Sequence, residues 1–121
     1  MKETLWLDHD VRAPSRARRW IVQCCDEWNC AQLADSAALM ITELVTNVFL
    51  HARTDCVIDA VYASPTLRVT VTDEDGHLLS PQALSSTSEE GRGLAIIATL
   101  ADTWGVEQND GRKSVWFDLS R

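Results

Sequence analysis

The segment that most restricts the fold of this chain is the apolar run AALMITELVTNVFLHA at residues 37–52. Its apolar side chains recur every three or four residues, which predicts a helix with one buried face. Asp35 or Ser36 is the expected N-terminal cap, and the helix is expected to end at about His51. The stripe that should face the sheet consists of Ala37, Ile41, Leu44 and Val48.

The composition is typical of a single globular domain, for which the expected limits are residues 1–121. Hydrophobic residues make up 45% of the chain, which is enough for folding around a core. The formal net charge of −7 argues against nucleic acid or an anionic membrane as the main partner. The four arginines between residues 12 and 19 are interpreted as the solvated face of a helix.

The cysteines and the apolar runs bear on the cellular compartment. The four cysteines form no CxxC pair and have no histidine at zinc spacing, so we expect reduced, mostly buried thiols. No apolar run approaches the length expected of a membrane span, and no charged-then-apolar signal opens the chain. The sequence therefore predicts a cytoplasmic protein.

Turn residues divide the rest of the chain into short elements. Pro14 suits the first turn of a helix, and Asn109-Asp110-Gly111 suits a hairpin turn. Residues 74–92 show little apolar pattern and are expected to form a long loop. The predicted fold class is an α/β (α+β) sandwich, with helices on one face of a mixed, mostly antiparallel sheet. The expected strands are residues 4–7, 56–63, 67–73, 104–108 and 113–119, and the expected third helix is residues 93–102.

Two polar residues interrupt the apolar helix. Glu43 and Asn47 lie one turn apart, so their side chains share a face other than the apolar stripe. Met40, Leu39 and Leu50 flank them, which makes that face partly buried, and a carboxylate there is costly without partners. The two residues either form a functional site or hydrogen-bond to neighbouring loops, and the helix alone favours neither interpretation.

Other candidate site residues lie near the ends of elements. Asp73 ends a strand on its apolar side, so its carboxylate could accept a hydrogen bond from the exocyclic amine of a base; the alternative is an ordinary turn-starting aspartate. Gly91 and Gly93 are expected to open a helix, where backbone N–H groups can approach phosphate. Arg92 could add a charge-assisted contact. Ser114 begins the last strand, where a hydroxyl is usually solvated.

The order of these features resembles the GHKL (Bergerat-fold) ATPase superfamily. Within it, the chain is most similar to the bacterial anti-sigma-factor serine/threonine kinases, and the resemblance covers nearly the whole sequence. The segments that carry it are ELVTN with HA at residues 43–52, Asp73, GRGL at residues 91–94, ADTWGV at residues 101–106 and GRKSVWFDL at residues 111–119.

The resemblance implies roles for individual residues. Asn47 would hold a Mg²⁺ ion bound to the phosphates of ATP. Glu43 would be the general base that accepts the proton of a serine hydroxyl on a protein substrate. Asp73 would read adenine from the start of the first glycine box. The other nucleotide-binding residues that the resemblance implies are Gly91, Arg92, Gly93, Leu94 and Ser114, the last in the place of a common threonine.

The implied function is phosphorylation of a serine on an anti-anti-sigma partner, together with sequestration of a sigma factor. Family members often form homodimers. The alternative is an ATP-binding, partner-binding module of the same fold with weak or no turnover, because the expected D-x-G-x-G motif reads DEDGH at residues 73–77. Arg92 is the only basic residue expected near the γ-phosphate. A histidine-kinase catalytic domain ranks last, since it needs an upstream dimerisation domain and roughly forty residues precede the ELVTN motif.

Overall fold

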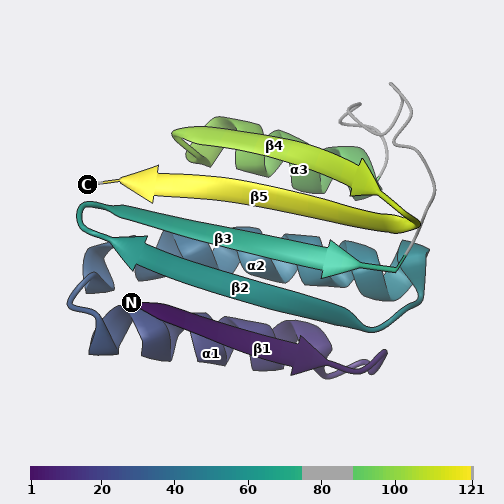
Figure 1. Ribbon diagram of the computed structural model, residues 1–121, viewed down its shortest axis with the longest axis horizontal. Coiled ribbons are helices and arrows are strands. Elements are labelled where there is room, and N and C mark those ends of the chain that lie inside the picture. The colour runs from purple at the N-terminus through teal and green to yellow at the C-terminus, as the bar shows by residue number, and fades with distance from the viewer. Residues whose placement is uncertain (75–88, 121) are drawn as a thin grey trace.

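The computed structural model describes residues 1–74 and 89–120, which form a five-stranded sheet with three α-helices packed on it (Figure 1). Of residues 89–92 only the backbone is described. The strands are β1 (Lys2–Leu7), β2 (Cys56–Ala63), β3 (Thr66–Asp73), β4 (Thr103–Asn109) and β5 (Arg112–Ser120). The helices are α1 (Ala13–Glu27), α2 (Ala34–Asn47) and α3 (Glu89–Leu100).

The arrangement confirms the predicted fold class. The strand order is β1-β2-β3-β5-β4, and all three helices lie behind the sheet in the view of Figure 1. The sequence predicted a mixed, mostly antiparallel sheet, and each pairing among the described strands is antiparallel. Because β5 returns beside β3, the end of β3 and the start of β5 meet at the same edge of the molecule.

The predicted cap of α2 was wrong. A 3₁₀ turn, Ala31–Leu33, runs directly into the helix, so Leu33 occupies the N-cap position without a side-chain hydrogen bond. Asp35 lies in the first turn instead, where a carboxylate interacts favourably with the helix dipole. After Asn47 the helical path continues as a π-helical turn, Val48–Ala52, which confirms the predicted end near His51.

The helical segment Ala31–Ala52 is longer and more apolar than we expected from the sequence. By length and composition its 22 residues could cross a membrane, which corrects the expectation that no run approaches this length. Core helices of globular proteins can have the same length and composition, and 44% of the most apolar part of this segment is buried inside the structure. The segment packs against the sheet and against its two neighbouring helices, as a core helix does.

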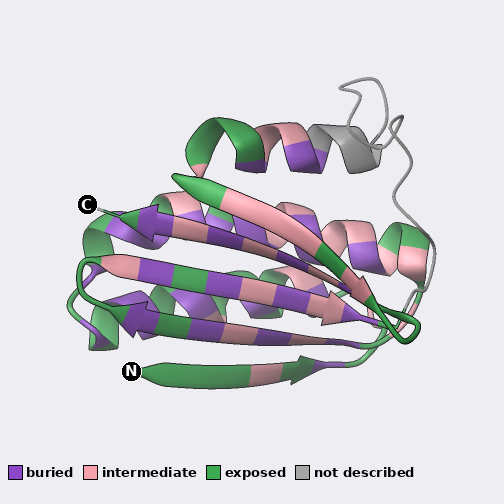
Figure 2. Ribbon diagram, turned by 45° about the horizontal axis from the view of Figure 1, so that its top comes forward, coloured by how far each residue is buried: buried purple, intermediate pink, exposed green. Residues whose placement is uncertain are grey.

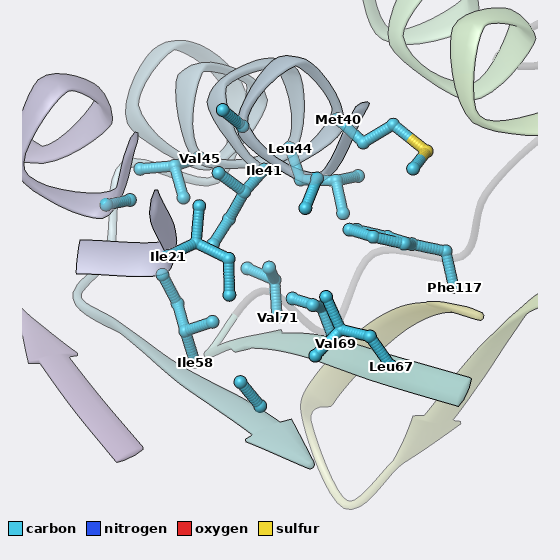
Figure 3. Packing of buried hydrophobic residues seen from close by; sticks show 14 of the residues in the cluster. Ile21, Met40, Ile41, Leu44, Val45, Ile58, Leu67, Val69, Val71 and Phe117 are labelled. Carbon is cyan, nitrogen blue, oxygen red and sulfur yellow. The ribbon is translucent and has the colours of Figure 1, made fainter. Parts of the chain in front are cut away.

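The core lies between α2 and the middle of the sheet. The predicted stripe of α2 is fully or almost fully buried, and Figure 3 shows Ile41 and Leu44 pointing toward Val69 and Val71 of β3. Along β2, β3 and β5, buried residues alternate with more exposed ones, as the banding in Figure 2 shows. The alternation assigns one face of each strand to the helices and the other to the outer side of the sheet.

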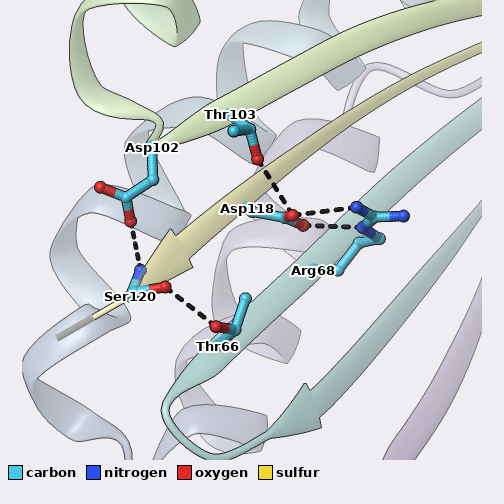
Figure 4. Close-up of polar contacts among 6 residues, drawn as sticks. All are labelled: Thr66, Arg68, Asp102, Thr103, Asp118 and Ser120. Carbon is cyan, nitrogen blue, oxygen red and sulfur yellow. Dashed lines mark hydrogen bonds and ion pairs between the residues drawn. The ribbon is translucent and has the colours of Figure 1, made fainter.

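Polar side chains fix the register of β3, β5 and β4 on the outer face (Figure 4). Arg68 donates to both carboxylate oxygens of Asp118, over 2.7 and 2.9 Å. Its guanidinium also lies 4.2 Å from the ring centre of Trp116, and Thr103 donates to Asp118 from β4 over 3.1 Å. Bidentate geometry restricts the relative positions of the strands. A one-residue slip of β5 would exchange its two faces, so this network helps to decide which side chains reach the helices.

The β4–β5 hairpin confirms the predicted turn. Asp110 and Gly111 have φ values of 50° and 76°, as the two central residues of a type I′ turn require. Asn109 pairs with Arg112 on either side of the turn. The hairpin thereby places Lys113 directly opposite Asp73 of β3.

Candidate functional site

A pocket opens at the edge of the molecule where β3 ends and β5 begins. Its total volume is about 380 Å³ up to the open mouth, of which about 30 Å³ accepts the centre of a water molecule. The first value includes open solvent, and the second shows that the interior is narrow. The lining residues come from α2, the π-helical turn, β3, α3 and β5: Leu44, Asn47, Val48, Val71, Asp73, Leu94, Lys113 and Val115.

Asp73 lies on the pocket side of β3, as the alternation of that strand predicted. The residue is 3% exposed, and its carboxylate oxygen Oδ2 lies 3.9 Å from the Lys113 ammonium. Apolar side chains of Leu44 and Val71 line the same space. A carboxylate has several acceptor sites, so beside its present contacts Asp73 can also accept a hydrogen bond from the amine of a base. The role of Asp73 in reading adenine stays a prediction.

Glu43 and Asn47 both lie half-buried on the helical face that the sequence predicted. Asn47 lines the pocket, and the backbone of Gly93 lies close against it. A methyl group at Gly93 would be 2.6 Å from Asn47 Nδ2 and 3.7 Å from Glu43 Cβ. Only glycine therefore leaves the Asn47 amide in this position. The close approach of α3 brings the second glycine motif next to the ELVTN motif.

The structure corrects the start of α3. The sequence predicted that Gly91 and Gly93 open the helix, but α3 begins at Glu89, so both glycines and Arg92 lie within its first turns. Gly93 and Leu94 are buried, and Leu94 lines the pocket. The side chain of Arg92 lies outside the described part of the chain. The predicted loop of residues 74–92 also falls mostly outside it.

Ser114 does not line the pocket, although the resemblance implies that it binds the nucleotide. It lies on the outer face of β5, where its hydroxyl pairs with that of Thr72 over 2.8 Å. The strand alternates strictly, and Val115 and Phe117 point to the helices on the opposite face. The hydroxyl therefore holds two strands together, and the pocket position next to it belongs to another residue.

That residue is Lys113, which was not among the site residues predicted from the sequence. It is 9% exposed, lines the pocket and pairs with Asp73 across β3 and β5. The signal that could have found it is the two-residue period of β5, because Lys113 shares its face with Val115. Lys113 adds a basic residue to the pocket lining, whereas the expectation that Arg92 is the only basic residue near the γ-phosphate stays a prediction.

The residues described around the pocket can contribute little to a metal ion by themselves. Among the residues that the structure describes, no three His, Cys, Asp or Glu side chains gather into a metal site. Mg²⁺ prefers few protein oxygens and keeps waters and phosphate oxygens as its other ligands. The Asn47 amide in the pocket lining, with Glu43 one turn away, fits such a phosphate-bound ion and no metal held by the described residues alone.

Comparison with solved structures agrees with this fold. The structure of the RsbU and RsbW domains of Rv1364c from Mycobacterium tuberculosis matches with a TM-score of 0.78 and 16% identity, over 99% of this chain and 32% of that chain. This chain thus spans about a third of that protein. Acinetobacter baumannii histidine kinase AdeS matches with a TM-score of 0.60 and 12% identity, over 98% of this chain and 67% of that chain. At such identities the likeness shows the GHKL fold.

Sequence comparison gives the family. An uncharacterized protein of Streptomyces coelicolor, SCO4941, is 39% identical over 80 residues, which cover 62% of this chain and 76% of that protein. The model of the histidine kinase-like ATPase domain matches residues 7–119, which is nearly the whole chain and includes every residue that lines the pocket. The chain belongs to the histidine kinase-like ATPase domain family.

Proposed function

We propose that this chain is an ATP-dependent protein serine/threonine kinase of the anti-sigma-factor type. It transfers the γ-phosphoryl group of ATP to a serine of an anti-anti-sigma partner, and it sequesters a sigma factor in the cytoplasm. The observation that carries the proposal is a buried Asp73 in a mostly apolar pocket that Asn47 also lines, with Gly93 packed against Asn47. The likeness to an RsbW domain supports the choice of partners.

The residues present fit ATP and Mg²⁺ in two respects. The Asp73 carboxylate and the apolar walls suit the edge and faces of a base. The glycine at position 93 allows α3 to approach the side-chain amide of Asn47, which lines the pocket. When bound, ATP supplies the phosphoryl group and Mg²⁺ neutralises charge on its phosphates. Asn47 would hold the ion, and the N-terminal turns of α3 would face the phosphates.

Glu43 is the residue proposed to move a proton. The half-buried Glu43 lies on α2 one turn before Asn47, with its Cβ atom close to Gly93. From there Oε1 or Oε2 would accept the proton of the attacking serine hydroxyl. A rigid helix holds both residues at fixed separation, which is what positioning chemistry requires.

A partner-binding module with weak or no turnover is the second candidate. The specific observation in its favour is the sequence after Asp73, where Asp75 and His77 replace the two glycines expected of the first glycine box. The narrow pocket interior also favours slow or weak nucleotide entry. Intact Glu43 and Asn47 favour the kinase.

Calorimetric titration of ATP with and without Mg²⁺ tests the nucleotide site. We expect Asp73→Asn to weaken binding about ten- to a hundred-fold, since it replaces the charged acceptor of a charge-assisted hydrogen bond with a neutral amide. Asp59→Asn makes the same charge change on the outer face of β2, where Thr4 donates to it, and should bind as the wild type does. Equal affinities for Asp73→Asn and wild type would refute the site.

Single-turnover phosphotransfer to a candidate anti-anti-sigma protein separates the two functions. The kinase proposal expects transfer by the wild type and a loss of roughly 10²–10⁴-fold in Glu43→Gln, which keeps the shape but cannot take the proton. Undiminished ATP binding by that variant would show that the loss is one of chemistry. ATP binding without any transfer to cognate partners would establish the module instead.

A further inference from the structure

The pocket contains a charged group for which the proposed function has so far given no role. Lys113 is the one basic residue among the described residues that line the pocket, and it is almost completely buried. A buried ammonium loses hydration, and a buried ion pair is weak evidence for a contribution to stability. A lysine at this place therefore calls for an explanation in terms of what the pocket binds.

The geometry of the pair leaves room for a ligand. Lys113 Nζ lies 3.9 Å from Asp73 Oδ2, whereas a direct N–H···O hydrogen bond spans about 2.7–3.2 Å. The Lys113 ammonium carries three N–H donors, so its ion pair with Asp73 leaves donors that can bind a ligand. Because the two residues are direct cross-strand partners, their side chains reach the same part of the pocket.

The charges of the pair match one edge of adenine. A carboxylate only accepts hydrogen bonds and an ammonium only donates them. Adenine presents its exocyclic amine, a donor, beside ring nitrogen N1, an acceptor. Resting on the proposed function, we propose that Lys113 is a second base-reading residue, which donates to N1 of adenine while Asp73 accepts from the amine.

The surroundings place Lys113 at the base and not at the phosphates. Leu44, Val71 and Val115 line the pocket beside it and suit the faces of an aromatic ring. The Asp73 carboxylate next to the ammonium would repel a phosphate group. Phosphates are instead expected beside Asn47, where Gly93 packs against its side-chain amide.

The test compares ATP with 1-deaza-ATP, an analogue in which carbon replaces ring nitrogen N1. For the wild type we expect the analogue to bind about ten- to a hundred-fold more weakly, the effect of one charge-assisted hydrogen bond. Lys113→Met keeps the length of an unbranched apolar stem without the donor. This variant should bind ATP more weakly than the wild type and should not distinguish the two nucleotides.

Two further variants control the comparison. Arg112→Met removes the same charge one residue away from an exposed side chain that pairs with Glu74, so it should keep the wild-type preference for ATP. Lys113→Gln retains a donor without the charge and should keep a reduced preference, which preserves the test if the methionine variant unfolds. Thermal unfolding of each variant shows which ones are folded.

The outcomes are distinguishable. ATP binding by the wild type with equal affinity for 1-deaza-ATP would overturn the role of Lys113 and leave the proposed function intact. Tighter ATP binding by Lys113→Met would also overturn it, because the lysine would then block the pocket. A wild-type preference for GTP would show that the pair reads guanine. Absence of any nucleotide binding by the wild type would overturn the proposed function together with this inference.

Discussion

Replacing Gly93 by alanine should separate the stability of α3 from the geometry of the proposed site. Gly93 is a buried interior residue of α3, and its φ is not in the left-handed region. Glycine inside a helix is less favourable than alanine by about 0.8–1.0 kcal/mol. By helix propensity alone, Gly93→Ala should therefore stabilise the protein.

The contact with Asn47 opposes that gain. The new methyl carbon would lie 2.6 Å from Asn47 Nδ2, whereas non-bonded atoms prefer about 3.5 Å or more. The amide must therefore move by about 1 Å, and an off-rotamer side chain costs about 0.5–1.5 kcal/mol. The two effects nearly cancel, so the free energy of unfolding of Gly93→Ala should stay within about 0.5 kcal/mol of the wild-type value.

A double-mutant cycle isolates the contact. In an Asn47→Ala background the amide is absent, and Gly93→Ala should there stabilise the protein by about 1 kcal/mol. Urea denaturation of the wild type, the two single variants and the double variant gives the coupling, which should be about 0.5–1.5 kcal/mol. The displaced amide should also lower single-turnover phosphotransfer by about a hundredfold, because such steps tolerate little misplacement.

Ala98→Gly is the matched control. Ala98 is exposed on the same helix, so this substitution changes propensity in the opposite direction without a contact to Asn47. Its effect should be equal in both Asn47 backgrounds. If Gly93→Ala stabilised the protein equally in both backgrounds and left phosphotransfer unchanged, the argument that glycine makes room for the amide would be refuted.

Three further predictions concern the rest of the fold. Gly105→Ala would place a methyl group 2.8 Å from the Trp116 indole and should lower the free energy of unfolding by about 1–3 kcal/mol, measured by urea denaturation. Hydrogen bonds from Arg68 lower the pKa of Asp118, so its contribution to stability is present above pH 4 and lost as pH falls; Asp118→Asn should weaken the acid dependence of the melting temperature. Burial raises the pKa of the Cys56 thiol to about 12. Because the thiol loses its proton more easily in the unfolded chain, the free energy of unfolding should fall as pH rises above about 9. All four cysteines are buried, so they should react with a thiol reagent at pH 8 only after unfolding.

Periodicity was sufficient to predict the parts of the site that depend on one element. The 3.6-residue period of α2 predicted the buried stripe and placed Glu43 and Asn47 together on another face. The two-residue period of β3 predicted that Asp73 points to the helices. Both patterns extend over several apolar side chains, so the free energy gained by burying these side chains outweighs the conformational preference of any single residue.

Features that depend on two elements were predicted less well. Leu33 replaces the expected cap of α2 because a 3₁₀ turn precedes the helix, and no local pattern signals that continuation. Gly93 was interpreted as a helix-opening residue, but its size is required by the approach of α3 to α2. Family likeness selected Ser114, whereas the alternation of β5 assigned Lys113 to the pocket. A motif match identified the strand, and only the register identified which of its residues lines the pocket.

The glycine inside α3 also bears on the choice between a site that binds a ligand and a scaffold that only holds a partner. Without the Asn47 amide beside it, the helix would be more stable with alanine in this place, by about 0.8–1.0 kcal/mol. The glycine is explained if the Asn47 amide must keep its present position, since no other residue leaves that space. A partner-binding surface elsewhere on the molecule would not require an ordered amide in this pocket. The local loss of helix stability is therefore better explained by a site that binds a ligand at Asn47 than by a scaffold that only holds a partner.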